Sequence, residues 1–244
     1  MSGSLAVVTG TSSGIGAAIA NALIAANWRV VGISRRQTLI ESELYTHITL
    51  DLNESKRIPS AIEEIIASHG PIAALINNAG IGYFAPHEEL SPTEIQEMVS
   101  VNLLAPLLIT RSALRSLKET SGHIVSISSF SALESSSFGA AYAATKAGIK
   151  HFSDSLFDEV RKSGVKVTTI TPDITRTPFY DHLNFYPQED PAAAISPEYI
   201  ASAVLNALSN SNFCVTTHIT LRPQRLLLAK RVAIKGKIKG QESR

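Results

Sequence analysis

The chain has 244 residues, of which 44% are hydrophobic, and its 22 basic side chains nearly balance its 21 acidic ones. This length allows one large α/β domain with a sizeable core, and the small net charge excludes strong electrostatic steering toward nucleic acid. The only cysteine, Cys214, cannot form an internal disulfide and favours a reducing compartment.

No targeting segment is expected. The first residues lack the basic and long apolar regions of a secretory signal. The most apolar run, at 103–109, is interrupted by Pro106 and is far shorter than the ~18 residues that a membrane span needs. We therefore expect a cytoplasmic protein.

Short apolar runs alternate along the chain with longer segments of helical periodicity. In chain order the pattern predicts a strand at 5–9, a helix at 14–26, strands at 29–34 and 47–50, a helix at 57–68, a strand at 73–77, a helix at 91–118, a strand at 123–128, a helix at 140–162, a strand at 165–171, a helix at 197–209 and a strand at 213–221. Ser91, Pro92 and Glu94 have the pattern of a capping box at the third helix. Continuous aliphatic strands between amphipathic helices predict a doubly wound α/β fold: one domain with seven parallel strands.

Two segments fit none of these elements. Residues 172–196 contain four prolines and four aromatic residues, which is typical of a long loop or lid. Residues 222–244 are predicted to form a basic C-terminal tail, with eight Lys or Arg and one acid. The tail could be disordered, dock as a helix on this subunit or a partner, or contact an anionic membrane, and the membrane contact has the least support.

The stretch TGTSSGIG, at 9–16, joins the first predicted strand to the first helix. Gly10 allows a tight turn, Gly14 allows close approach of a ligand, and Gly16 allows the helix to pack on the strand. The amides and dipole at the start of the helix favour a pyrophosphate. An ordinary glycine-containing turn is the alternative, but the position at the first strand–helix junction favours a dinucleotide.

The end of the second predicted strand bears on the choice of cofactor. Sites for NAD usually carry an acid here, whereas sites for NADP carry an arginine near the 2′-phosphate. This chain has Ser34 followed by Arg35 and Arg36. A guanidinium pairs with a phosphate that a carboxylate would repel, so the sequence favours NADP. The alternative is that one or both arginines only face solvent.

The stretch YAATK places Tyr142 and Lys146 on one face of a predicted helix, because they are four residues apart. A free phenol has a pKa near ~10, and a nearby cation favours the phenolate. We therefore expect Lys146 to lower the pKa of Tyr142 and make it a usable acid and base.

Taken together, these motifs resemble those of the short-chain dehydrogenases/reductases. The resemblance rests on TGTSSGIG, NNAG at 77–80, Asn102, Ser129 and YAATK, in the order and spacing of that family, and it covers about residues 4–221. It implies a Rossmann-type fold, a nicotinamide cofactor, and interconversion of a carbonyl and an alcohol of a small-molecule substrate. It also implies an NADP-binding catalytic domain at 1–221 and a homo-oligomer, a dimer or tetramer, formed through the helices at 91–118 and 140–162.

The resemblance assigns catalytic roles to four residues. Tyr142 resembles the acid/base, Lys146 the ribose-binding lysine, Ser129 the carbonyl-orienting serine, and Asn102 the asparagine of a water-linked proton relay. Ser128 competes with Ser129, although the spacing to Tyr142 favours Ser129. Asn102 could instead only kink its helix.

The motifs and the resemblance also define the expected NADP(H) site. Its contacts are predicted at Gly10, Ser12, Ser13, Gly14, Ile15, Gly16, Ser34, Arg35, Arg36, Asp51, Leu52, Asn78, Ala79, Gly80, Tyr142, Lys146, Pro172, Ile174 and Thr177. Asp173 replaces the glycine usual in the family. It could point to solvent, which we favour, or it could shape the substrate pocket or lower the affinity for the cofactor. Substrate contacts are expected from 82–87, 130–139 and the lid. The seven histidines show no metal-binding spacing, so no metal is expected.

Two other functions stay open. The chain could be a non-catalytic NADP-binding sensor or scaffold, although the complete Asn, Ser, Tyr and Lys set argues against this. It could also be a sugar-nucleotide epimerase or dehydratase, but those chains are usually longer, with a larger C-terminal substrate domain.

Overall fold

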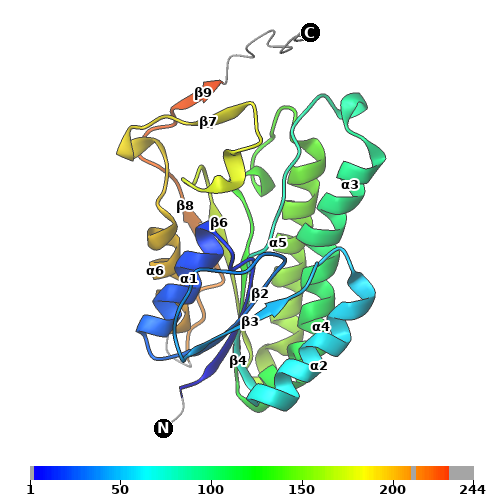
Figure 1. Cartoon of the computed structure of the whole chain (residues 1–244), viewed down its shortest axis with the longest axis vertical. Helices are drawn as coiled ribbons and strands as arrows, with labels where there is room; N and C mark the ends of the chain where they lie inside the picture. Colours follow the sequence, from blue (N-terminus) through cyan, green and yellow to red (C-terminus); the bar gives the residue numbers. More distant parts are fainter. Residues whose placement is uncertain (1–2, 210–212, 231–244) are drawn as a thin grey trace, which may run out of the picture.

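Seven parallel strands form the centre of the protein in the computed structural model, which describes residues 3–209 and 213–230 (Figure 1). Across the sheet the strands are β3 Tyr45–Thr49, β2 Arg29–Ser34, β1 Leu5–Thr9, β4 Ile72–Asn77, β5 His123–Ile127, β6 Lys166–Pro172 and β8 His218–Leu221. All six pairings are parallel. The order reverses between β1 and β4, and the predicted doubly wound, Rossmann-type α/β fold is confirmed.

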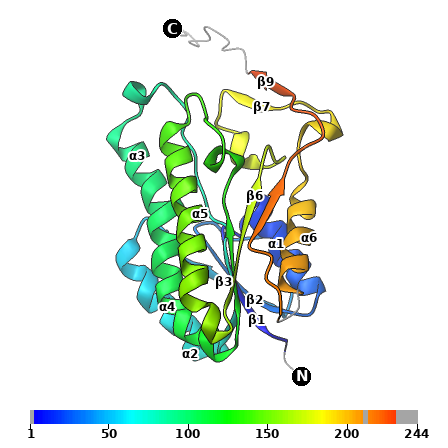
Figure 2. The same cartoon turned by 180° about the vertical axis from the view of Figure 1, so that it is seen from behind.

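Helices cover both faces of this sheet (Figures 1 and 2). One face carries α1 Gly14–Ala25 and α6 Pro197–Leu208, and the other carries α2 Ile58–His69, α4 Ala105–Glu119 and α5 Ala140–Val160. Each face has its own apolar core. Strand β1 shows how the sequence supplies both: Leu5 and Val7 pack on the α2–α4–α5 side, whereas Ala6 and Val8 pack on the α1–α6 side. Side chains alternate along a strand, so a strand buried on both faces is apolar throughout.

The helix expected at 91–118 is a continuous helical run with an irregular centre. It consists of α3 Pro92–Val99, a π-helical segment Ser100–Leu104, and α4. The predicted capping box is present, with both Ser91–Glu94 hydrogen bonds formed. The π segment, which the periodicity did not predict, contains Asn102, and such segments occur often at functional sites.

This run also has the length and composition of a membrane span. Pro92–Glu119 is the one such helix in the described part of the chain, with a mean hydropathy of 1.2 over its most apolar window. The residues of that window are 44% buried, and those of α4 pack in the core on the α2–α4–α5 side of the sheet. A single helix of this kind is weak evidence for a membrane, because core helices have the same composition.

The last strand of the sheet is shorter than expected. The pattern predicted a strand at 213–221, but β8 covers only His218–Leu221, where it pairs with β6 from Thr169 to Pro172. The apolar alternation before His218 therefore does not correspond to regular pairing.

The proposed lid at 172–196 contains regular structure. It includes two short 3-10 turns, Pro178–Tyr180 and Pro191–Ala193, and the strand β7 Phe185–Pro187. Strand β7 pairs antiparallel with β9 Leu228–Lys230, which belongs to the segment expected to be a tail (Figures 1 and 2). The first part of that segment thus packs on the lid, and the rest of the predicted tail, 231–244, lies outside the described residues.

Candidate active site

A cleft of about 1500 Å³ opens at the carboxyl ends of the parallel strands. In doubly wound folds this edge, at the reversal of strand order, is the usual ligand site. The cleft collects the loop after β1, the loop after β4, the β5–α5 connection, the lid, and residues of the C-terminal segment. Every predicted cofactor and catalytic residue lines it except Asn102, which lies behind it.

The loop after β1 has the geometry of a phosphate cradle. Gly10 and Gly14 have positive φ angles of 78° and 56°, which favour glycine. A Cβ on Gly16 would lie 2.2 Å from the carbonyl oxygen of Gly10. Ser13 precedes α1 but its side chain does not cap the helix, and the first turn carries no acid. The N-terminal amides of α1 therefore fit a phosphate group.

The loop after β4 supports this cradle. The side-chain amide of Asn78 donates to the carbonyl of Thr9 at 2.8 Å, and the Thr9 hydroxyl accepts from the amides of Asn78 and Ala79 at 3.0 Å. The NNAG motif thus joins β4 to the end of β1. On the other side, the hydroxyls of Thr11 and Tyr45 lie 2.9 Å apart.

The end of β2 carries positive charge at the same cleft. The Ser34 hydroxyl donates to the carbonyl of Arg36 at 2.8 Å and is buried. Arg35 and Arg36 line the cleft, and a nitrogen of Arg35 lies 3.9 Å from the Asp51 carboxylate. Because the Arg35 side chain is 63% exposed, it is accessible to a phosphate in the cleft. This end of the cleft therefore offers cationic side chains to an anionic group.

Tyr142 and Lys146 lie on the buried face of α5. The Lys146 ammonium donates to the carbonyl of Ile127 at 3.0 Å and lies 5.9 Å from the centre of the Tyr142 ring. A Cβ on Gly80 would come within 3.2 Å of the Lys146 nitrogen, so the glycine leaves room for this side chain. The helical face predicted from the four-residue spacing is present.

The pKa of the Tyr142 phenol differs from the expectation. Burial raises the pKa of the Tyr142 phenol to about 12, although a hydrogen bond with Ser129 lowers it. Burial also lowers the pKa of the Lys146 ammonium to about 8. We expected the cation to lower the pKa of the phenol, but in the protein alone removal from water outweighs any such attraction.

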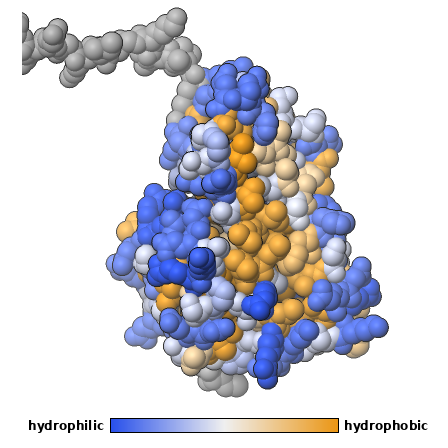
Figure 3. Space-filling model, turned by 90° about the vertical axis from the view of Figure 1, so that its right-hand side faces the viewer, coloured by the Kyte–Doolittle hydropathy of each residue, from blue (hydrophilic) through white to orange (hydrophobic). Residues whose placement is uncertain are grey.

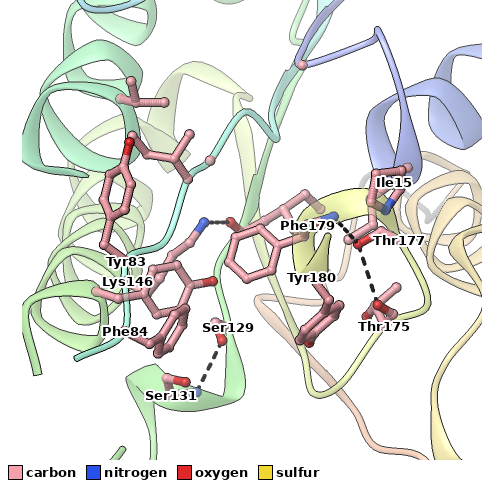
Figure 4. A pocket seen from close by; sticks show the side chains of 18 of the residues that line it. Ile15, Tyr83, Phe84, Ser129, Ser131, Lys146, Thr175, Thr177, Phe179 and Tyr180 are labelled. Atoms are coloured by element: carbon pink, nitrogen blue, oxygen red, sulfur yellow. Dashed lines mark hydrogen bonds between the residues drawn. The ribbon is translucent and has the colours of Figure 1, made fainter. Parts of the chain in front are cut away.

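The two candidate serines have different partners. The Ser128 hydroxyl is buried and donates to the carbonyl of Lys146 at 2.9 Å. The Ser129 hydroxyl interacts with the Tyr142 phenol and accepts from the amide of Ser131 at 3.3 Å (Figure 4). This geometry favours Ser129 as the residue beside a reacting oxygen.

Asn102 connects the π segment to two neighbouring elements. Its side-chain oxygen accepts from the amide of Ile81 at 2.9 Å, and its side-chain nitrogen donates to the carbonyl of Ile81 at 2.8 Å and to the hydroxyl of Thr145 at 3.1 Å. Asn102 thus ties the loop after β4 to α5, one residue before Lys146.

Comparison with known proteins agrees with this arrangement. The sequence profile described as short chain dehydrogenase matches residues 4–185. The chain belongs to this family. An uncharacterized oxidoreductase from Staphylococcus epidermidis is 31% identical over 226 residues, covering 90% of this chain and 96% of that protein.

Two solved structures resemble most of this short-chain dehydrogenase. An alcohol dehydrogenase from Thermococcus sibiricus, complexed with 5-hydroxy-NADP, is 26% identical with a TM-score of 0.80, and the match covers 90% of this chain and 96% of that one. A metagenomic short-chain oxidoreductase in complex with NADP is 30% identical with a TM-score of 0.76, covering 91% of this chain and 97% of that one.

In this short-chain dehydrogenase, Asp173 does not point to solvent as we favoured. Its carboxylate accepts from the amide of Ile174 at 2.9 Å and from Nε of Arg222 at 3.2 Å, and its side chain is only 10% exposed. The carbonyl of Ile174 accepts from the amide of Ile195 at 2.8 Å. Both backbone groups of Ile174, a predicted cofactor contact, are therefore engaged within the protein.

Aromatic side chains gather on this side of the cleft, where Figure 4 shows Phe84, Phe179 and Tyr180. The rings of Phe84 and Phe179 lie 5.2 and 5.9 Å from that of Tyr142, between centroids, and Tyr180 packs on Phe179 at 5.4 Å. Burial is the main cause that raises the pKa of Tyr180, and Tyr142 and Asp173 add to it. Aromatic rings thus pack around the Tyr142 ring on this side of the cleft.

The part of the site that follows β8 was not predicted from the sequence. Arg222, Leu226, Leu228 and Lys230 line the cleft, although all four lie in the segment expected to be a tail. Their only sequence signal was their position directly after the last strand of a parallel sheet, whose carboxyl end faces the cleft.

Proposed function

We propose that this short-chain dehydrogenase is an NADP(H)-dependent oxidoreductase that interconverts a carbonyl and an alcohol on a small molecule. One observation carries the proposal. The phenol of Tyr142, the hydroxyl of Ser129 and the ammonium of Lys146 are brought together at one end of a cleft whose other end holds a phosphate cradle and two arginines.

NADP(H), when bound, supplies the hydride chemistry. The protein's own residues handle the oxygen of the substrate. Ser129 donates a hydrogen bond to that oxygen as negative charge develops on it. Tyr142 then transfers its phenolic proton to the oxygen, and Lys146 supplies positive charge near the phenolate that remains. The bonds of Asn102 to Ile81 and Thr145 hold the loop after β4 and α5 in register.

Burial raises the pKa of the Tyr142 phenol to about 12, so in the protein alone the phenol carries its proton at neutral pH. The hydrogen bond with Ser129 acts against this shift and so makes the phenol a stronger acid. Carbonyl reduction uses this proton, whereas alcohol oxidation starts from the phenolate.

The choice of NADP(H) follows from the end of β2. Arg35 and Arg36 line the cleft there, and β2 ends in Ser34 where NAD sites have an acid. The two solved relatives in complex with 5-hydroxy-NADP and NADP support this assignment.

We also propose that the enzyme works in the cytoplasm as a homo-oligomer, through the helical run Pro92–Glu119 and α5. The side of the molecule that carries the long helices shows a broad hydrophobic area in Figure 3. Val99 and Leu104, in the helical run Pro92–Glu119, are 43% and 39% exposed. Surfaces of this kind mark sites of association, and sedimentation or light scattering of the purified protein tests the assignment.

The decisive test is a panel of aldehydes and ketones, each offered with NADPH and with NADH, for the wild type and Tyr142→Phe. We expect NADPH to be oxidised by some of the panel and the variant to be nearly inactive. Tight NADPH binding without turnover of any carbonyl would favour a sensor instead. A nicotinamide that stays bound with no net oxidation, while a sugar nucleotide is converted, would favour an epimerase.

A further inference from the structure

Arg222 lies close to the reaction centre although it belongs to the C-terminal segment. It follows β8 directly, and its guanidinium carbon lies 4.1 Å from the centre of the Phe130 ring. Phe130 is the next residue after Ser129, whose hydroxyl interacts with the Tyr142 phenol. Both Arg222 and Phe130 line the cleft. A cation thus packs on the residue that directly follows Ser129 in the chain.

The position of Arg222 is fixed from one side only. Its Nε donates to Asp173 at 3.2 Å, and this carboxylate is held in turn by the amide of Ile174 at 2.9 Å. Stacking on Phe130 fixes the plane of the guanidinium. Its terminal nitrogens have no hydrogen-bond partner among residues 3–209 and 213–230. Their outer edge is the pair of donors that matches a planar carboxylate.

The other charges on this side of the cleft leave Arg222 available. The carboxylate of Glu97 accepts from the Tyr83 hydroxyl at 2.6 Å, and Asp181 also has a partner. Glu134 is exposed at the rim. The second basic side chain here is Lys230 on β9, which makes no ion pair in the described part of the chain. Aromatic rings form much of the inner wall, and the serine hydroxyls at 129–137, His182 and Asn184 supply its other polar groups.

We propose that Arg222 binds a carboxylate of the substrate, so that the enzyme acts on oxo acids whose carboxylate and carbonyl are separated by a few bonds or by one aromatic ring. The inference rests on the proposed carbonyl reductase function and extends it to a substrate class. Asp173, in place of the usual glycine, is then the residue that orients the guanidinium. The aromatic wall formed by Phe84 and Phe179 accommodates the apolar body of the substrate.

The test compares oxo acids with their own methyl esters. Acetoacetate, 4-oxopentanoate and 4-formylbenzoate are each assayed with NADPH against the ester, for wild type, Arg222→Met, Arg222→Lys and Arg225→Met. Arg225 is the matched control, because it lies in the same segment and also pairs with a carboxylate, Asp190 at 3.0 Å, but does not line the cleft. Circular dichroism and NADPH binding establish that each variant is folded.

The wild type is expected to prefer at least one acid over its ester in kcat/KM. Arg222→Met should lose about 10- to 100-fold on the acid, the scale of a charge-assisted pair, and less than about threefold on the ester. Arg222→Lys should fall between, and Arg225→Met should match the wild type. A wild type that prefers every ester, or equal losses by Arg222→Met on acid and ester, would overturn the assignment.

A binding titration separates this inference from the proposed function. Each acid is titrated into the complex with NADP⁺ by calorimetry, which needs no turnover. Weaker binding by Arg222→Met, by at least about tenfold, supports the carboxylate site even if no carbonyl is reduced, in which case the proposed function alone fails. Equal binding to wild type and Arg222→Met, or no binding to either, overturns the site while leaving reduction of neutral carbonyls intact.

Discussion

The ammonium of Lys146 lies 5.9 Å from the centre of the Tyr142 ring and is held there by the carbonyl of Ile127, at 3.0 Å. Both side chains are buried, and burial favours the neutral form of each, raising the pKa of the phenol to about 12 and lowering that of the ammonium to about 8. The strand end thus fixes the cation beside the phenol, while the phenol keeps its proton at neutral pH.

The first prediction concerns Tyr142→Phe. The change removes the proton that reduction requires and leaves the ring in place, so kcat should fall by about 10²- to 10⁴-fold. NADPH affinity, measured by fluorescence titration, should change little. Tyr83→Phe is the control, because that phenol also lines the cleft but donates to Glu97. Retention of more than a tenth of the activity by Tyr142→Phe would refute the proposed acid.

The second prediction separates the two neighbouring serines. Ser129→Ala should lower kcat by about 10²- to 10³-fold, since it removes a donor to the developing charge. Ser128→Ala removes the bond to the carbonyl of Lys146, so it should instead lower the free energy of unfolding by about 1–2 kcal/mol. Steady-state kinetics and urea unfolding of both variants measure the two effects. Reversed effects would assign the catalytic hydroxyl to Ser128.

Much of the fold could be predicted from the sequence because its signals are local. Each buried strand is a short aliphatic run, and each covering helix has an amphipathic period. The π segment could not be predicted in this way, since the run from Pro92 to Glu119 is periodic throughout. Its irregularity accompanies the bonds of Asn102 to Ile81 and Thr145, which are tertiary contacts.

The candidate site likewise has one part that local sequence patterns predict and one part that they do not. The phosphate loop and the Tyr142–Lys146 face are encoded by short spacings, and the structure places both at the cleft. The part of the cleft formed by the segment after β8 is not encoded by a short spacing. Strands β7 and β9 are three residues each and lie about forty residues apart in the chain. Such short non-local pairs carry no periodic signal, and the high basic content of the segment suggested a solvated tail.

The third prediction concerns the cofactor. Arg35→Ala should raise the KM for NADPH by about 10- to 100-fold and leave that for NADH nearly unchanged, because only NADPH carries the 2′-phosphate. Ser34→Asp should reverse the preference by placing an acid at the end of β2. Arg115→Ala is the control, since that side chain is 95% exposed on α4. An unchanged ratio of kcat/KM for the two cofactors in Arg35→Ala would contradict the assignment.

The fourth prediction concerns Gly16→Ala. The new Cβ would lie 2.2 Å from the Gly10 carbonyl oxygen and 2.5 Å from the side-chain nitrogen of Asn78, so the phosphate loop must shift. NADPH affinity should fall at least about tenfold, and the free energy of unfolding by about 1–3 kcal/mol. Gly70→Ala is the control that separates a loss of stability from a loss of NADPH binding. Gly70 has a φ of 88° and no atom of the described chain within 4 Å of an added Cβ, so that variant should lose about 1 kcal/mol in the free energy of unfolding and bind NADPH normally.

The last prediction concerns acid stability and His123. This side chain is buried, its Nε2 lies 2.7 Å from the Thr168 hydroxyl, and its Nδ1 has no hydrogen-bond partner within the described part of the chain. Burial, with a smaller contribution from Lys166, lowers its pKa to about 4. The unfolded chain binds a proton at His123 below about pH 6.5, which the folded protein does not bind until about pH 4.

Acidification through this window therefore favours the unfolded state. At pH 5 the His123 contribution to the free energy of unfolding should be about 2 kcal/mol smaller than at pH 7.5. His123→Asn cannot titrate, so the stability difference between wild type and variant should narrow by that amount between the two pH values. Urea unfolding at both values measures it. A constant difference would mean that the folded protein also protonates His123 near pH 6.5, and hence that water reaches the free Nδ1 at the start of β5.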